Sequence, residues 1–363
     1  MNEPSFAFMT TRKIKYLGCV AAVAVSGLGA APPTAAAARH VVLPGQSIQQ
    51  AVDAAQPGDT IVIAPGTYRE SVLITKSRLT LRGAGSRTVI MPPASGAGAG
   101  NRCATAGNGM CVLGTDAQPV QGTTIRSLRL SGFKKNALWA SRTDRLTVQG
   151  VIAEKNGQWG IAEERSTRSL FWGNTARDNA ESGLFLSNTI DTEAGATDTQ
   201  GTVVRYNLLQ RNRIGVTVRR LRNLTVANNS VTGNCNGVFV VGDEGRPQAG
   251  DMAIRRNTIY SNNKYCAQTA RLPYIQGSGI VLTGAEDTLV EGNVIRGNEG
   301  KSTFSGGIVL YKSFVGAVNQ RNVIRDNMVL GNTTADLANR DTTGSGNRFS
   351  GNLCKVSEPA GMC

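Results

Sequence analysis

Apolar and polar positions along the chain follow a repeated short pattern instead of one continuous amphipathic period. A six-residue box (Asn, any residue, an apolar residue, two residues of any type, Asn) recurs through the chain. Its copies are NTARDN (174–179), NLLQRN (207–212), NSVTGN (229–234), NTIYSN (257–262), NVIRGN (293–298), NVIRDN (322–327) and NRFSGN (347–352), preceded by two degenerate copies, LRLSGF (128–133) and VIAEKN (151–156). Successive boxes start 22 to 36 residues apart, which suits one coil of three short strands with loops inserted into some coils.

A second element, Gly-apolar-any-apolar, follows most boxes. Its copies are GLFL (183–186), GVTV (215–218), GVFV (237–240), GIVL (279–282) and GIVL (307–310). Alternation points the two apolar side chains to one face of a strand, and a third apolar strand runs into each box. Stacked coils of this kind can bury one continuous core that no single coil could bury. We therefore predict an all-β fold, a single-stranded right-handed parallel β-helix solenoid with three parallel sheets and about nine coils.

The closing residue of the box is Asn in eight coils, and this regularity predicts an Asn ladder at one sharp turn per coil. Asn tolerates left-handed backbone geometry, and its amide can bond to the coils above and below. The predicted ladder is Asn156, Asn179, Asn212, Asn234, Asn262, Asn298, Asn327 and Asn352.

The two ends of the repeat have a different character. The N-terminal stretch has basic residues, a Gly-broken apolar run and a small-residue cleavage site, which is typical of a secretory signal peptide. Ser47 and Gln50 then form a capping box for a short helix that can plug the open end of the solenoid. The predicted organisation is a signal at 1–38 and one β-helix domain at 39–363, made of an N-terminal cap (39–70), coils (about 71–352) and a disulfide-closed tail (353–363).

Six of the seven cysteines follow the predicted signal. An even number of cysteines in an exported chain favours disulfides. We predict the pairs Cys103–Cys111, Cys235–Cys266 and Cys354–Cys363, with the middle pair linking neighbouring coils, and a secreted, extracellular protein.

The chain carries 39 basic and 25 acidic side chains, a formal net charge of +14. Outside the cell such a charge attracts polyanions, so acidic polysaccharides and cell-wall polymers are the expected partners, with ordinary surface charge as the alternative. No basic helix or aromatic RNA-binding motif is found, so no nucleic acid is expected. Beyond the signal, no segment is long and apolar enough to span a membrane, and we expect a monomer.

The segment PGQSIQQAVDAAQPGDTIVIAPGTYRESV (44–72), followed by the stacked boxes and Gly-led strands, resembles the pectin-lyase-like right-handed parallel β-helix superfamily. The resemblance covers nearly the whole chain after the signal. That superfamily includes polysaccharide lyases, glycoside hydrolases, uronate epimerases and proteins of no known activity, so the resemblance implies a substrate class by analogy. The chain lacks the Asp-Pro-His-Asp of alginate epimerases and the Asp-Asp and Gly-His-Gly of polygalacturonases, and its one histidine, His40, precedes the cap helix.

Inserted loops on both edges of the Gly-led strands indicate a groove. Those at 189–201 and 242–250 follow the strand, and those at 263–278 and 299–305 precede it. Ordinary solvated loops are the alternative. One predicted wall is acidic (Asp191, Glu193, Asp198, Asp243, Glu244, Glu286 and Asp287), and the other is basic and aromatic (Lys264, Tyr265, Arg271, Tyr274 and Lys301).

Alternation also predicts the floor of this groove. One outward row is Trp139, Ala162, Phe185, Thr217, Phe239, Val281 and Val309, and the next is Ser141, Glu164, Ser187, Arg219, Val241, Thr283 and Tyr311. Exposed aromatic rings on such a floor can stack on sugars, whereas burial beneath the inserted loops is the alternative.

These features suggest an enzyme acting on acidic polysaccharide by β-elimination or epimerisation. That chemistry needs a cation against the uronate carboxylate, here Arg219 or Arg220, and a base, here Tyr311 or Lys312. Asp243, Glu244 and Asp287 are expected to serve as oxygen ligands if Ca²⁺ takes part. Substrate contacts are predicted at Trp139, Phe185, Phe239, Arg271 and Tyr274. The alternatives are a non-catalytic secreted carbohydrate-binding or surface module, and a glycoside hydrolase with a carboxylate pair.

Overall fold

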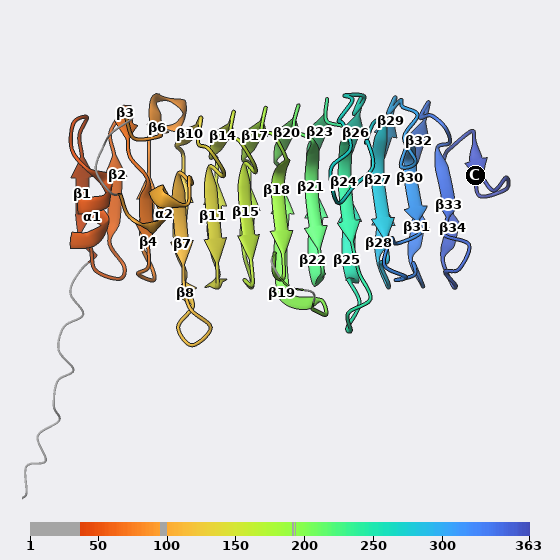
Figure 1. Cartoon of the computed structure of the whole chain (residues 1–363), viewed down its shortest axis with the longest axis horizontal. Helices are drawn as coiled ribbons and strands as arrows, with labels where there is room; N and C mark the ends of the chain where they lie inside the picture. The colour runs from red at the N-terminus through yellow and green to blue at the C-terminus, as the bar shows by residue number, and fades with distance from the viewer. Residues whose placement is uncertain (1–36, 95–99, 191, 193) are drawn as a thin grey trace, which may run out of the picture. The chain divides into compact units, whose positions relative to one another are not determined.

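The computed structural model describes residues 37–94, 100–190, 192 and 194–363. These residues form a solenoid of parallel strands (Figure 1), which confirms the predicted all-β parallel β-helix with three sheets. The predicted signal, 1–38, lies almost wholly outside the described residues, as do Asp191 and Glu193 of the predicted acidic wall.

Most coils contribute one strand to each of three sheets, and neighbouring strands within a sheet pair in parallel.

Sheet A contains β1 (Arg39–Val42), β2 (Thr60–Ile63), β5 (Thr80–Arg82), β9 (Thr124–Arg126), β13 (Thr147–Gln149), β16 (Leu170–Trp172), β19 (Thr197–Arg205), β22 (Leu221–Ala227), β25 (Gly250–Arg255), β28 (Leu289–Glu291), β31 (Val323–Arg325) and β34 (Arg348–Ser350).

Sheet B contains β3 (Gly66–Arg69), β6 (Thr88–Met91), β10 (Arg129–Ser131), β14 (Ile152–Glu154), β17 (Thr175–Arg177), β20 (Leu208–Gln210), β23 (Ser230–Thr232), β26 (Thr258–Tyr260), β29 (Val294–Arg296) and β32 (Met328–Leu330).

Sheet C contains β4 (Val72–Ile74), β7 (Met110–Leu113), β11 (Leu138–Ser141), β15 (Ile161–Glu164), β18 (Ser182–Ser187), β21 (Ile214–Arg219), β24 (Asn236–Val241), β27 (Ser278–Thr283), β30 (Gly306–Tyr311), β33 (Leu337–Arg340) and β35 (Ser357–Glu358). A small extra sheet pairs β8 (Val120–Gln121) with β12 (Thr143–Asp144).

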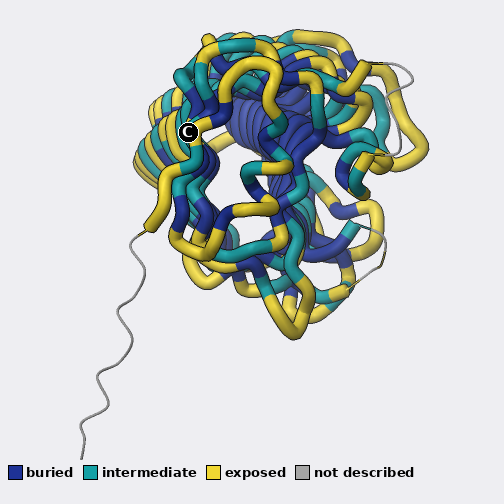
Figure 2. The backbone as a smooth tube through the Cα atoms, turned by 90° about the vertical axis from the view of Figure 1, so that its left-hand side faces the viewer, coloured by how far each residue is buried: buried dark blue, intermediate teal, exposed yellow. Residues whose placement is uncertain are grey.

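The core runs along the inside of the coils, where the buried backbone forms a continuous stack in the end-on view of Figure 2. Because side chains alternate along a strand, the central residue of each three-residue strand in sheets A and B points inward. Val148 of β13 and Leu209 of β20 are both fully buried in this way. Sheet C adds pairs such as Val216 and Val218.

Two Asn ladders run along the solenoid, one at each end of the sheet B strands. The ladder at the end of these strands joins Asn156, Asn179, Asn212, Asn234, Asn262, Asn298 and Asn332, each amide donating to the next side chain at 2.8–3.2 Å. The ladder before these strands joins Asn174, Asn207, Asn229, Asn257, Asn293, Asn327 and Asn352 at 2.9–3.0 Å.

The predicted ladder is therefore correct from Asn156 to Asn298 and wrong at its last two members. Asn327 and Asn352 belong to the other ladder, because the boxes 322–327 and 347–352 contain sheet A strands. The box that closes on Asn332 is NMVLGN (327–332). Sheet B has ten strands, so about nine coils was also an underestimate.

The sharp turn depends on the residue before each ladder Asn. Arg211 and Gly233 have positive φ angles of 56° and 66°, whereas Asn212 and Asn234, which follow them, do not have a positive φ. The ladder Asn therefore supplies hydrogen bonds and its predecessor supplies the left-handed backbone, which corrects the role expected from the sequence.

The N-terminal end is plugged by α1 (Ile48–Ala54) as predicted. Ser47 accepts a hydrogen bond from the Gln50 amide, and Ile48 and Val52 are buried against the first coil. The carboxylate of Glu70 also accepts from the amide of Ile48 at 2.7 Å, so this residue completes the N-terminal cap.

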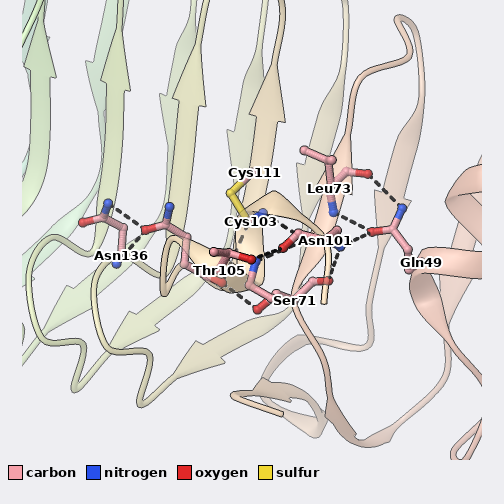
Figure 3. The surroundings of a disulfide bond; sticks show 10 residues. Gln49, Ser71, Leu73, Asn101, Cys103, Thr105, Cys111 and Asn136 are labelled. Carbon is pink, nitrogen blue, oxygen red and sulfur yellow. Dashed lines mark hydrogen bonds between the residues drawn. A yellow bond between two sulfur atoms is a disulfide. The ribbon is translucent and has the colours of Figure 1, made fainter. Parts of the chain in front are cut away.

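All three predicted disulfides are present. Cys103–Cys111 fastens an excursion containing α2 (Arg102–Thr105) to β7. Figure 3 shows Asn101 beside this bond, where its amide donates to Gln49 of α1 at 2.8 Å and to the Ser71 carbonyl at 2.9 Å. The excursion is thereby tied to the cap helix and to the first coil. Among the described residues no helix is long and apolar enough to cross a membrane.

Candidate functional site

The outer face of sheet C has the register that alternation predicts. The first outward row runs through Trp139, Ala162, Phe185, Thr217, Phe239, Val281 and Val309 in successive coils. The second runs through Ser141, Glu164, Ser187, Arg219, Val241, Thr283 and Tyr311. The sequence therefore identified correctly which side chains point away from the core.

Inserted loops bury the C-terminal part of this face. Phe239 is 1% exposed and packs with Phe304 at a ring-centroid distance of 5.4 Å, in a second apolar cluster that also contains Val281 and Val309. Phe239 therefore belongs to a small core beneath the loops, which corrects its expected role as a substrate contact. Removing these apolar side chains from water stabilises the fold, so the inserted loops cover them.

The Cys235–Cys266 disulfide holds this cover in place. Cys235 precedes β24, and Cys266 lies in the loop inserted before β27, with Cα atoms 6.0 Å apart. The bond therefore ties the insertion of one coil to the coil before it.

Replacing both Cys235 and Cys266 with Ala is expected to lower the free energy of unfolding by roughly 3–4 kcal/mol, since 31 residues separate the pair. The loop at 263–277 is expected to become sensitive to limited proteolysis, measured by mass spectrometry. The control is the double Ala variant of Cys354 and Cys363, which should leave that loop protected. Equal loop cleavage in both variants would contradict this account of the cover.

The N-terminal part of the same face carries an aromatic stack. Trp159 lies parallel to Phe185 at 4.0 Å and stacks on Trp139 at 6.0 Å. Trp139 is half-buried, whereas Trp159 and Phe185 are buried. Trp139 is therefore the most accessible ring of this stack, and the buried Phe185 does not have the exposed face that a substrate contact would need.

The two predicted cationic residues have different environments. Arg219 is half-buried in the second outward row. The neighbouring Arg220 is 1% exposed, and its guanidinium donates to the carbonyl groups of Thr189 at 3.0 Å and Thr192 at 2.9 Å. It also lies 3.2 Å from the carboxylate of Asp243. Arg220 thus anchors the loop at 189–201, which corrects the expectation that it faces a substrate.

The two predicted bases are remote from Arg219. Tyr311 lies three coils further along its row, a separation of about 14 Å at the usual strand spacing. Its ring packs edge-on against Phe304 at 4.7 Å, and Lys312 is exposed just beyond it. The structure therefore does not unite Arg219 with Tyr311 or Lys312 around one sugar.

The three predicted Ca²⁺ ligands are also separate. Asp243 is paired with Arg220, Asp287 accepts two hydrogen bonds from Arg321 at 2.8 Å, and Glu244 is exposed. No three His, Cys, Asp or Glu side chains gather into a metal-binding group in the part of the chain that the structure describes.

The two predicted contacts in the covering loop lie on its surface. Arg271 is exposed, and the half-buried Tyr274 stacks on Tyr265 at 5.7 Å. The Tyr274 hydroxyl donates to the Lys301 carbonyl at 2.5 Å. Tyr274 therefore joins the two inserted loops to each other.

A basic hollow lies at the corner between sheets B and C. It has a volume of about 420 Å³, and its charged lining comprises Lys155, Asp178, Arg211 and Lys264. Arg211 donates to both carboxylate oxygens of Asp178 at 2.7 and 2.9 Å. The remaining charge from the two lysines makes this hollow suitable for an anionic group.

Glu181 directly follows the rim of this hollow, next to the lining residue Ala180. Burial raises the pKa of its carboxyl, although the Arg213 guanidinium 3.7 Å away favours the charged form. A carboxylate whose pKa is raised is a stronger base than an ordinary surface carboxylate, which makes Glu181 a candidate for proton transfer.

Glu181, Lys155 and Arg211 are candidate site residues that the sequence pattern does not reveal. They lie at the turn from sheet B to sheet C, where the box pattern predicts only a structural role. Lys264 was predicted as part of a wall, and it is the member of that wall that lines the hollow.

Comparisons with known proteins support the fold. Residues 99–249 match the family model described as "Right handed beta helix region". No curated protein matches the sequence. Three similar solved structures are the A-module of mannuronan C-5 epimerase AlgE6 from Azotobacter vinelandii, DFA-IIIase from Arthrobacter chlorophenolicus A6 without its lid in complex with GF2, and XylC in complex with xylose.

The epimerase module is 18% identical, with a TM-score of 0.53 and coverage of 86% of this chain and 90% of that chain. The corresponding values are 13%, 0.57, 88% and 90% for DFA-IIIase, and 9%, 0.54, 86% and 69% for XylC. The described residues therefore have a right-handed parallel β-helix fold, the fold that these solved structures share. At these identities the likenesses establish the fold and not the reaction.

Proposed function

We propose that the protein is secreted and binds an acidic polysaccharide on the outer face of sheet C, where it carries out lyase- or epimerase-type chemistry. The observation that supports this most is the basic hollow beside Glu181. The hollow, at the corner where sheet B turns into sheet C, offers positive charge for a carboxylate, and Glu181 directly follows its lining residue Ala180 as the candidate proton-transfer group. The three disulfides are compatible with an extracellular location.

Both reactions begin with removal of the proton next to a uronate carboxylate. Glu181 takes this proton as its carboxylate, and Lys155 and Lys264 offset the negative charge that develops on the substrate. In a lyase the electron pair then forms a carbon–carbon double bond and expels the glycosidic oxygen, which takes up a proton. In an epimerase a proton returns to the same carbon from the opposite face.

We assign Arg219 to a different sugar of the same polysaccharide chain. Arg213, which lies 3.7 Å from Glu181, directly precedes β21, and Arg219 ends that strand six residues later. At the usual rise this is roughly 20 Å, so Arg219 cannot act on the sugar beside Glu181. The half-buried ring of Trp139 provides a stacking surface on the same face.

A hydrolase is less well supported by the carboxylates on this face. Glu164 is paired in register with Ser187, which is six residues beyond Glu181, so Glu164 and Glu181 are about 20 Å apart. Hydrolytic carboxylate pairs lie about 5–9.5 Å apart. A non-catalytic binding module remains the second candidate, because the hollow can hold an anion whether or not Glu181 transfers a proton.

The binding test uses the mature protein with polygalacturonate, alginate and glycosaminoglycans, with and without Ca²⁺. Replacing Lys155 and Lys264 with Gln is expected to weaken binding of the preferred polymer about ten-fold, or about 1.4 kcal/mol, by calorimetry. The control changes Lys301 and Lys355, both exposed and outside the hollow, to Gln. Equal losses in both variants would mean diffuse attraction and would contradict the site.

Glu181→Gln is expected to reduce turnover at least a hundred-fold with little change in affinity, consistent with loss of a general acid–base group. Unsaturated uronate absorbance reports elimination, and proton NMR reports epimerisation. Glu299→Gln, at an exposed loop carboxyl, is the control. Turnover that survives in Glu181→Gln would reject its catalytic role, and binding without turnover in the unmodified protein would favour the non-catalytic module.

A further inference from the structure

A row of arginines runs along the outer face of sheet A, on a different side of the coil from the proposed site. In successive coils the same outward position is occupied by Arg82, Arg126, Gln149, Trp172, Arg205, Ala227 and Arg255. The residues next to them along the strands, such as Val148, point into the core. At the usual spacing of strands the row is about 29 Å long. We call the residues from Arg82 to Arg255 at this position the arginine row.

No carboxylate neutralises this row among the described residues. Arg82, Arg126, Arg205 and Arg255 form none of the ion pairs found in that part of the chain. By contrast, Arg325, two coils beyond Arg255 at the same outward position, lies 2.5 Å from Glu291. The charge is therefore concentrated on one stretch of the face.

Two guanidinium groups in the row are also incompletely satisfied. The Nε atoms of Arg126 and Arg205 are buried and lack a hydrogen-bond partner. Arg205 lies over the ring of Trp172 at 5.4 Å, and this ring is 38% exposed. The row thus combines positive charge, unused donors and an accessible aromatic surface.

The start of the row opens into a second hollow. This hollow of about 450 Å³ is lined by Arg39, Arg82 and Arg87, and its lining contains no acidic side chain. Arg82 belongs to both the hollow and the arginine row, so the hollow adds two guanidinium groups, those of Arg39 and Arg87, to this end of the row.

We propose that the arginine row is a second binding surface for a carboxylated polysaccharide that lies parallel to the axis of the solenoid. A polyuronate carries one carboxylate on each sugar, and these repeat along an extended chain at about the interval at which the coils repeat. Guanidinium groups recognise carboxylates by charge-assisted hydrogen bonds, and Trp172 can contact a sugar ring. This surface does not depend on the proposed chemistry at sheet C.

The test compares two charge-matched variants of the mature protein. One changes Arg82, Arg126, Arg205 and Arg255 to Gln, and the control changes four basic residues that lie outside sheet A, Arg69, Arg102, Arg296 and Lys355. The probes are polygalacturonate and single-stranded DNA of equal charge, at about 0.15 M ionic strength. The row variant is expected to lose roughly ten-fold or more in affinity for polygalacturonate, and the control about two-fold or less.

A smaller pair of variants guards against misfolding. Arg82 and Arg255 are exposed, so changing only these two to Gln should preserve the circular dichroism spectrum and still weaken binding more than Arg69 and Lys355 changed together. Similar losses in row and control variants would overturn the proposal, as would equally strong, row-dependent binding of DNA. The Lys155 and Lys264 variant separates the two surfaces, since its failure to weaken binding counts against the sheet C site alone.

Discussion

In the variant Glu163→Gln, the free energy of unfolding is expected to fall much less than in the unmodified protein as pH rises from about 4.5 to about 8. Glu163 points into the core from β15, where it pairs in register with Ala140 and Leu186. Its carboxyl is 3% exposed and accepts a hydrogen bond from Ser169 at 2.5 Å. Burial raises its pKa from 4.5 to about 8.

The direction of this pH dependence follows from the number of protons bound by the folded and the unfolded protein. Between pH 4.5 and 8 the folded protein keeps the proton on Glu163, whereas the unfolded chain has lost it. The free energy of unfolding therefore falls as pH rises through this window, by up to about 1.4 kcal/mol per pH unit and about 4–5 kcal/mol in all. The neutral Gln side chain fills a similar volume without this titration.

Urea unfolding at several pH values between 4 and 9 measures this effect. The control is Glu164→Gln. Glu164 is the next residue on the same strand and points outward, so this change should leave the slope of the free energy of unfolding against pH nearly unchanged. Parallel stability curves for the unmodified protein and Glu163→Gln would show that Glu163 is not responsible. Because a buried neutral amide replaces a buried acid, the variant is expected to be the more stable protein above pH 8.

The fold could be predicted because two independent sequence patterns, one within each strand and one from coil to coil, agree. Alternation within each strand identified the inward residues, and the repeated box identified the coils. The misassigned boxes at 322–327 and 347–352 show the limit of this reasoning. Both corners flanking a sheet B strand use a left-handed residue followed by Asn, so the letters alone do not distinguish the two corners.

The site was harder to predict because exposure depends on distant segments. Alternation placed Phe239 on the outer face correctly, but its burial depends on Phe304, which lies 65 positions later in the chain. Arg220 lies just beyond its strand, where alternation ends, and its left-handed backbone directs the side chain to a loop. Side-chain environment at such turns follows from tertiary contacts that the local pattern does not contain.

Asn234→Ala is expected to lower the free energy of unfolding by about 3–4 kcal/mol, a large effect for a polar residue. Asn234 is fully buried, and its side chain accepts from the Asn212 amide at 2.8 Å while donating to Leu209 and Asn262 at 3.0 and 2.9 Å. Removing the side chain leaves buried backbone groups of the neighbouring coils without partners. Each unsatisfied group costs about 1–3 kcal/mol.

The control for this prediction is Asn263→Ala, one residue beyond the adjacent ladder position. Asn263 is half-buried, and its side-chain carbonyl (Oδ1) accepts from the Glu299 amide, so loss of this side chain should cost about 1 kcal/mol or less. Chemical unfolding followed by circular dichroism measures both variants. If the two changes cost the same, the ladder stabilises the coils no more than an ordinary surface hydrogen bond does. A large cost at Asn234 alone would mean that each coil is held to its neighbours by side-chain amides as well as by strand pairing, because the apolar core is unchanged in both variants.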